Sequence, residues 1–224
     1  MRSLHRSRAR WLLLIVPVAG FGLNGPRQQH QNLPSAPEPY DIPEAYEVYS
    51  VVLSKFANAA NGRVKRLVIR DTTSAPQALG PIEKCVGCAA FLKERADEIR
   101  EFEQGNRSPK LLQSKFHLKL PYDLVPQSKV DDLFRKVGPR DPWENFYAAF
   151  PAADGYVEVA AVGFNRNKTR AVVYAANHCG RLCGGGNYSF WEKGLRIYGY
   201  ILELWPFTGE WGPSYPETNC IWVS

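Results

Sequence analysis

The pattern of apolar and polar positions divides this chain into a helical first part and an extended last part. Ala45, Tyr49, Val52 and Phe56 recur at helical spacing, which predicts a helix that runs to about residue 59. Apolar residues keep the same period over 82–102, with charged residues between them, so we expect a second, solvent-facing helix there. Shorter helices are predicted over 128–137, which Ser128 and Asp131 frame, and over 142–150, where Asp141, Pro142 and Glu144 form the start.

Strand patterns dominate the last third of the chain. Short strands are also expected near 67–69, a short apolar segment, and over 116–120, where apolar residues alternate with polar ones. Short turns join the later segments, so neighbouring strands should pair antiparallel. The sequence thus predicts an α+β domain in which several helices cover one face of an antiparallel meander of four to five strands in the C-terminal half. The meander segments are 156–164, 169–176, 186–193 and 195–205, with a possible last strand at 220–223.

The N-terminal segment has the pattern of a secretory signal peptide. Four arginines and no acidic residue precede or flank an apolar run over 11–23, which Pro17 interrupts. We therefore predict a signal peptide over 1–25, a proline-rich disordered linker over 26–40, and a single globular domain over 41–224. The expected location is exported, periplasmic or extracellular, after signal cleavage. Retention as an anchor by residues 11–23 is the alternative that the pattern leaves open.

Charge changes this picture only at the N-terminus. The whole chain carries a net charge of +6 and has a pI near 9.1, which suggests an acidic partner. Without residues 1–25 the balance is 24 basic against 22 acidic residues, a net charge of +2. We therefore predict no nucleic-acid partner and no membrane span beyond the signal segment, and the sequence names no other partner.

Export to an oxidising compartment favours disulfides over free thiols for the five cysteines. Cys179 and Cys183 flank a predicted turn, which brings two Cα atoms close enough for a disulfide. We predict this bridge as a staple on a glycine-rich hairpin. The glycines that follow offer a second interpretation, a loop whose amides hold an anion, and nearby aromatic residues offer a binding platform. The possible ligand-facing residues are Gly184, Gly185, Gly186, Tyr188 and Trp191.

Three further cysteines leave the chemistry open. Cys85 and Cys88 form a C-x-x-C at the start of a predicted helix, where a thiolate is favoured, so thiol–disulfide exchange is one hypothesis. A structural bridge from either one to Cys220 is another. A zinc site built from the two cysteine pairs, with His178 beside them, is the weaker alternative.

Known catalytic motifs do not occur in the chain, and neither a cofactor nor a metal is predicted. His117 and His178 are the histidines of the predicted domain, and spacing alone does not pair either with a nucleophile. The sequence leans against an enzyme and favours a non-catalytic structural or ligand-binding domain, with no catalytic residue assigned.

The meander also carries a series of motifs. VGFN over 162–165, AVVY over 171–174, CGRLCGGG over 179–186 and the final WVS follow one another in this order. In this the chain resembles a group of uncharacterised exported bacterial proteins, although Ala161 stands where the group has serine. The resemblance implies export and a bacterial source, and it brings no activity.

Overall fold

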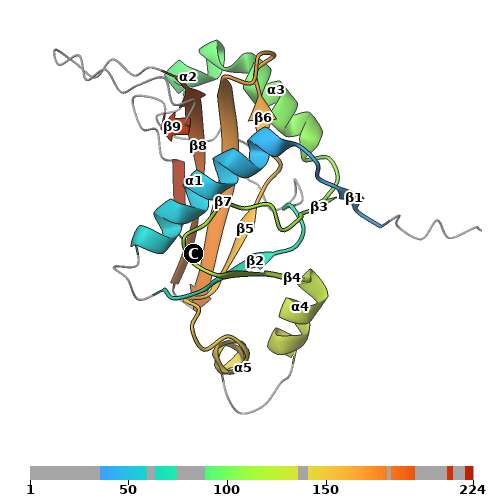
Figure 1. Ribbon diagram of the computed structural model, residues 1–224, viewed down its shortest axis with the longest axis vertical. Helices are drawn as coiled ribbons and strands as arrows, with labels where there is room; N and C mark the ends of the chain where they lie inside the picture. The colour runs from blue at the N-terminus through green and yellow to red at the C-terminus, as the bar shows by residue number, and fades with distance from the viewer. Residues whose placement is uncertain are drawn as a thin grey trace, which may run out of the picture. The chain divides into compact units, whose positions relative to one another are not determined.

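The computed structural model describes residues 36–59, 64–74, 89–135, 141–180, 183–194, 211–213 and 220–223 (Figure 1). All of them belong to one compact unit, Ala36–Ser224. The predicted signal segment and most of the predicted linker lie outside the described residues. Tyr40, which the sequence pattern assigns to the linker, is a buried core residue.

An eight-stranded mixed sheet forms the centre of this unit. The α+β class is confirmed, but the prediction of a purely antiparallel meander is wrong. β2 pairs in parallel with both β4 and β5, and antiparallel pairing begins only at β5 and β7. The strand order is β10 (Cys220–Val223), β8 (Cys183–Lys193), β7 (Arg170–Gly180), β5 (Tyr156–Val159), β2 (Leu67–Arg70) and β4 (Tyr122–Val125), with β6 (Gly163–Phe164) on β7 and β9 (Trp211–Pro213) on β8.

Parallel pairing follows from the helices that separate these strands in the chain. Between β2 and β4 the chain forms α2 (Ala89–Glu94) and α3 (Ala96–Gly105), and between β4 and β5 it forms α4 (Gln127–Arg135) and α5 (Pro142–Ala149). Parallel neighbours need such long crossover connections, whereas a short turn joins only antiparallel ones. One of these connections differs from the prediction. In its described part, the predicted helix over 82–102 is divided into α2 and α3 by a turn at Arg95.

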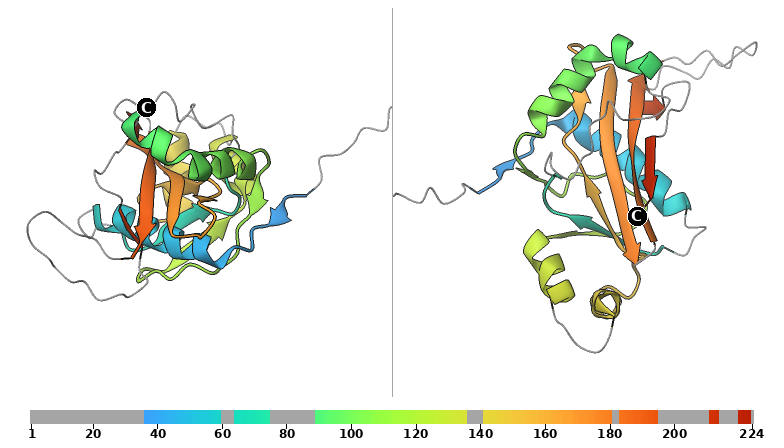
Figure 2. Two further views of the ribbon diagram at one scale, coloured as in Figure 1. Left: turned by 90° about the horizontal axis from the view of Figure 1, so that it is seen from above. Right: turned by 180° about the vertical axis from the view of Figure 1, so that it is seen from behind.

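Helices cover both faces of the sheet, which corrects the expectation of a single covered face (Figures 1 and 2). α1 (Pro43–Ala59) packs on one face, here called the α1 face, against Ala171, Val173 and Ala175 of β7. Val172 and Tyr174, which alternate with them, pack with Phe102 of α3 on the opposite face, here called the α3 face. α4 and α5 pack on the α3 face too, around Val68 at the other end of the sheet.

The predicted strand over 116–120 is not a strand. Phe116 is buried and its apolar neighbours pack on the α1 core, so the alternation reflects one buried side. The backbone of this segment pairs with side chains of α1 and not with a neighbouring strand. Gln113 donates its backbone N–H to the Tyr46 hydroxyl (2.9 Å), and His117 donates its own to Ser50 Oγ (2.8 Å). A small parallel pair, β1 (Glu38–Pro39) with β3 (Lys110–Leu111), precedes this segment in the fold.

A bulge separates β5 from β6, and both strands pair with β7. Its backbone groups are satisfied by side chains that reach in from α1, from the segment before it and from the end of α3. The Tyr49 hydroxyl donates to the Ala160 carbonyl oxygen (2.7 Å), and Val162 N–H donates to the Tyr40 hydroxyl (3.0 Å). Asn106 donates to the Ala161 carbonyl oxygen (2.9 Å) and accepts from Ala161 N–H (2.7 Å). Buried backbone groups need such partners, so the bulge has one fixed shape.

The fourth predicted meander segment, 195–205, lies outside the described residues. β8 is paired with β9 and β10 on its side away from β7. Among the helices that the structure describes, none is long and apolar enough to cross a membrane.

Candidate functional site

The predicted disulfide between Cys179 and Cys183 is confirmed. It closes the tip of the β7–β8 hairpin, with the two Cα atoms 5.1 Å apart. The prediction worked because both cysteines lie on one local turn, where the chain itself brings them together.

The backbone just before this disulfide is held from the α3 face. Tyr147 of α5 donates its hydroxyl to the Cys179 carbonyl oxygen (2.7 Å). Gly155 has a φ of +93°, and a Cβ atom there would lie 2.0 Å from the His178 carbonyl oxygen. Only glycine fits so close an approach at that backbone angle. Together these contacts fix the position of His178 in β7.

His178 belongs to a charged cluster that crosses three strands. Its Nε2 atom lies 3.2 Å from Glu158 Oε1 of β5. The other carboxylate oxygen of Glu158 accepts from Arg70 Nη1 of β2 at 2.8 Å. Glu158 therefore uses both oxygens to hold one cation and one imidazole. We refer to Arg70, Glu158 and His178 as the His178 cluster.

Burial within the cluster is graded. The Glu158 side chain is 9% exposed, that of Arg70 18% and that of His178 25%. Burial by itself raises the pKa of the Glu158 carboxyl, but the hydrogen bond and charge of His178, followed by the charge of Arg70, outweigh it, so this pKa is lowered. The carboxylate is the buried member, and the guanidinium and imidazole are the members that reach toward solvent.

Tyr156 forms an aromatic wall beside the cluster. It pairs with His178 across β5 and β7, and the two rings stack with centroids 4.7 Å apart. Burial and, to a lesser extent, the charge of Glu158 raise the pKa of Tyr156 to about 12. This hydroxyl is therefore neutral at physiological pH.

The cluster lies on the α3 face, because Glu158 alternates with Val157 and Val159 of the α1-face core and His178 has the same parity as Tyr174 and Ala176 of the α3-face core. Gly184 of β8 is the register partner of His178 on the side away from Tyr156. A glycine there places no side chain beside the imidazole. The glycine-rich segment thus has a structural role next to the histidine that the sequence pattern did not connect to it.

The predicted ligand-facing aromatic residues lie inside the protein. Trp191 is 1% exposed and packs in the α1-face core, whereas Tyr188 is 6% exposed and packs in the α3-face core against Phe102. Because they are an odd number of residues apart on one strand, they occupy opposite faces.

The remaining predicted site residues are not brought together within the part of the chain that the structure describes. Cys85 and Cys88 lie outside the described residues, so thiol exchange and zinc binding there stay predictions. Cys220 pairs with Tyr188 through the backbone of β10. Within the described part of the chain no group of three or more metal-binding side chains occurs.

Sequence reasoning missed Arg70 and Glu158. The available signal was a single charged residue at the end or in the middle of an otherwise apolar strand, in LVIR and YVEV. A buried charge is costly unless it is paired, so each one indicates a partner. The partner itself lies 88 residues away, at a separation that no local pattern specifies.

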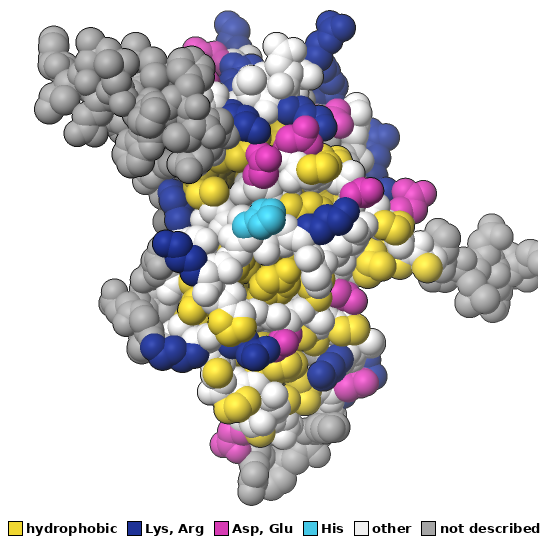
Figure 3. Space-filling view, in the orientation of Figure 1, with side chains coloured by type: hydrophobic (Ala, Val, Ile, Leu, Met, Phe, Trp, Pro, Cys, Tyr) yellow, Lys and Arg dark blue, Asp and Glu magenta, His cyan; other side chains and the backbone are white. Residues whose placement is uncertain are grey.

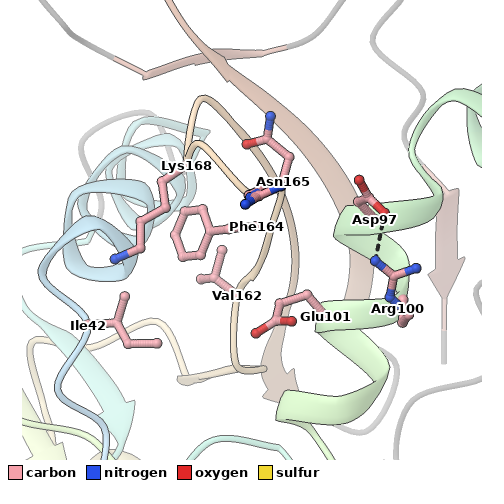
Figure 4. A pocket seen from close by; sticks show the side chains of 9 residues that line it. Ile42, Asp97, Arg100, Glu101, Val162, Phe164, Asn165 and Lys168 are labelled. Atoms are coloured by element: carbon pink, nitrogen blue, oxygen red, sulfur yellow. Dashed lines mark hydrogen bonds and ion pairs between the residues drawn. The ribbon is translucent and has the colours of Figure 1, made fainter.

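A groove of about 540 Å³ forms a second candidate site at the opposite end of β7 (Figure 4). It lies between α3 and the β6–β7 turn, and Ile42 just before α1 closes one side. Its floor is apolar and its rim is charged. The lining residues are Ile42, Val162 and Phe164 on the floor and Asp97, Arg100, Glu101, Asn165, Arg166 and Lys168 around it.

Elsewhere the described surface mixes both signs of charge. On the face shown in Figure 3, basic and acidic side chains are interspersed among small apolar groups.

Comparison of the chain with protein-family models, with curated proteins and with solved structures found no match.

Proposed function

We propose that this chain is an exported, non-catalytic ligand-binding domain, and that the His178 cluster holds an anionic group of its ligand. The observation that carries the proposal is the double use of Glu158. Both of its oxygens are engaged within the protein, by Arg70 and by His178. The atoms left for a ligand are therefore the Nη atoms of the guanidinium, whose Nε donates to Thr72 Oγ1, and the Nδ1 atom of the imidazole, which donates when the ring is protonated.

Such a pair of donors matches a carboxylate or a phosphate. Guanidinium groups bind these oxyanions with two parallel hydrogen bonds, and charge-assisted bonds are the stronger class. The stacked ring of Tyr156 adds a flat apolar surface beside the donors. A small ligand with an oxyanion and an aromatic or apolar body fits this combination.

Export is the second part of the proposal. The Cys179–Cys183 bridge supports an oxidising compartment, the basic and apolar start of the sequence supports a signal peptide, and the resemblance to exported bacterial proteins agrees with both. In this proposal the disulfide forms in the oxidising compartment after export and stabilises the hairpin that carries His178.

The test is a calorimetric titration of the oxidised protein with three probes, benzoate, acetate and inorganic phosphate, accompanied by the imidazole NMR signals of His178 in the proteins that keep this histidine. We expect saturable shifts for at least one probe. Arg70→Gln and His178→Gln should each weaken binding about tenfold, since each removes one charge-assisted contact. His117→Gln is the matched control, because His117 is exposed on the other side of the fold.

The three probes separate the possible sources of the oxyanion. Tighter binding of benzoate than of acetate indicates a carboxylate with an aromatic body, and preference for phosphate indicates a phosphoryl ligand. Absence of saturable shifts for all three, or equal affinity in wild type and in Arg70→Gln, would show that the cluster is only a structural ion pair.

A further inference from the structure

The groove of Figure 4 has rigid walls. Gly163 of β6 lies directly under α3, where a Cβ atom would be 2.2 Å from the Glu98 carbonyl oxygen and 2.5 Å from Phe102 N. Val162 on the floor belongs to the bulge whose backbone is held by Tyr40. The groove is therefore formed before any ligand arrives, which lowers the ordering cost of binding.

The opposite wall is equally fixed, by Asn165. Its Oδ1 accepts from the backbone N–H groups of Thr169 (2.8 Å) and Arg170 (2.9 Å), and its backbone N–H donates to the Arg170 carbonyl oxygen (3.1 Å). These bonds close the β6–β7 turn that carries Arg166 and Lys168. Asn165 and Gly163 of the VGFN motif thus shape the groove, although neither needs to contact a ligand.

Three of the five rim charges form ion pairs, and the other two form none within the described part of the chain. Arg100 pairs with Asp97 on α3 at 2.7 Å, and Lys168 pairs with Glu44 at 2.9 Å. Glu101 on α3 and Arg166 on the turn form no ion pair with any other described residue. Figure 4 shows the Glu101 side chain extending from α3 toward Val162. Burial is the main cause of the raised pKa of Tyr40, and the charges of Tyr46 and, least of all, Glu101 add to it.

The groove therefore presents an anion on one wall, a cation on the other and an apolar floor of Val162, Phe164 and Ile42 between them. The geometry points to a second binding site, for a short apolar peptide with free termini, whose ammonium group meets Glu101 and whose carboxylate meets Arg166. A single oxyanion satisfies only one wall, and an uncharged apolar ligand leaves both charges unpaired. The volume lies within the range of roughly 300–1,000 Å³ that is typical of small-ligand sites.

The placement of the two charges also favours a peptide over a single amino acid. The two charges of a free amino acid are adjacent, whereas the groove places its charges on opposite walls. An extended chain gains about 3.5 Å per residue, so a tripeptide separates its termini by about 10 Å. This site is distinct from the His178 cluster and does not depend on it.

The experiment is calorimetric titration of the oxidised full chain with the peptide Leu-Ala-Leu and with its N-acetylated and C-amidated forms. We expect each blocking group to weaken binding about fivefold, as is usual for a partly exposed ion pair. Glu101→Gln should weaken binding of the free peptide but leave binding of the acetylated one unchanged. Arg166→Gln should behave in the same way toward the amidated peptide.

Two matched control variants change residues in α3 or just after its last residue. Glu103→Gln and Arg107→Gln remove exposed charges of the same types that do not line the groove, and both should bind as wild type does. Arg70→Gln should also leave peptide binding unchanged, which separates this site from the proposed oxyanion site. The inference is overturned if the blocked peptides bind as tightly as the free one, if the controls lose as much affinity as Glu101→Gln, or if no peptide binds.

Discussion

Asn106 pairs with Ala161 as a neighbouring strand would, through one accepted and one donated hydrogen bond of 2.7 and 2.9 Å. The same amide nitrogen also donates to the Phe102 carbonyl oxygen at the end of α3 (2.7 Å). One buried side chain therefore ties the last turn of α3 to the bulge between β5 and β6. On the side away from β7, Asn106 thus supplies the bulge with the two hydrogen bonds that a neighbouring strand would supply.

Replacement of Asn106 by alanine should destabilise the protein by about 2–4 kcal/mol. The change leaves buried backbone groups of Ala161 without partners, and each unsatisfied group costs about 1–3 kcal/mol. Urea denaturation followed by tryptophan fluorescence measures the loss. Asn167→Ala, at an exposed position of the β6–β7 turn, should change the free energy of unfolding by less than about 0.5 kcal/mol. A small effect of Asn106→Ala would mean that water replaces the amide.

Two glycines on the contact between α3 and the sheet should respond to alanine with opposite signs. Gly163→Ala places a methyl group against the α3 backbone and should cost about 1–3 kcal/mol or more, because the helix has to move. Gly105→Ala places its methyl group 3.6 Å from Ala161 Cβ, an ordinary contact. This second change should be neutral or stabilise by up to about 0.5–1 kcal/mol, because alanine favours the helix. Thermal denaturation of both variants makes the comparison, and equal effects would contradict the close approach at Gly163.

Acid should weaken the fold partly through Glu158. Its pKa in the folded state lies below the ordinary value of 4.5, so the unfolded state takes up a proton first as the pH falls. The stabilisation is therefore fully present above about pH 4.5 and is lost as the pH falls through the lower, folded-state pKa. Glu158→Gln removes this contribution and should reduce the pH dependence of the urea midpoint between about pH 5 and pH 3. The idea fails if the variant keeps the full wild-type slope.

Loss of the hairpin disulfide should cost about 2 kcal/mol, the value expected from chain entropy for a loop this short. The double variant Cys179→Ser, Cys183→Ser tests this by urea denaturation, and the Ser224→Ala variant provides a baseline at the chain end. The imidazole signals of His178 should shift in the double variant, because the staple adjoins that residue. Unchanged His178 signals would show that the β-ladder alone holds the histidine. Peptide mapping of the unreduced protein should also recover the Cys179–Cys183 pair.

Local patterns in the sequence were enough for several elements. α1 was predictable from the period of Tyr49 and Val52, α5 from the Asp141 cap, and the hairpin disulfide from two cysteines on one turn. Each of these depends on residues within a few positions of one another. The capping bond from Trp143 N–H to Asp141 Oδ1 (3.0 Å), for example, joins residues two positions apart.

The burial of both faces of the sheet could also have been predicted from the sequence. AVVYAA in β7 is a continuous apolar run, which is typical of a strand covered on both faces, whereas a strand with one solvent face alternates. The expectation of a single covered face overlooked this difference. Burial confirms it, since Ala171 through Ala176 are all buried.

By itself, then, the sequence determined where most helices and strands form and which two neighbouring cysteines join, because short-range spacing governs both. Only the tertiary structure decided that β2 enters the sheet beside β5, since strand partners are chosen by the packing of the whole core and not by local pattern. That choice places Arg70 against Glu158 and turns two isolated strand charges into one cluster with His178. The tertiary structure also decided that Glu101 and Arg166 line one groove. The close packing of α3 on Gly163 brings together segments that lie far apart in the chain.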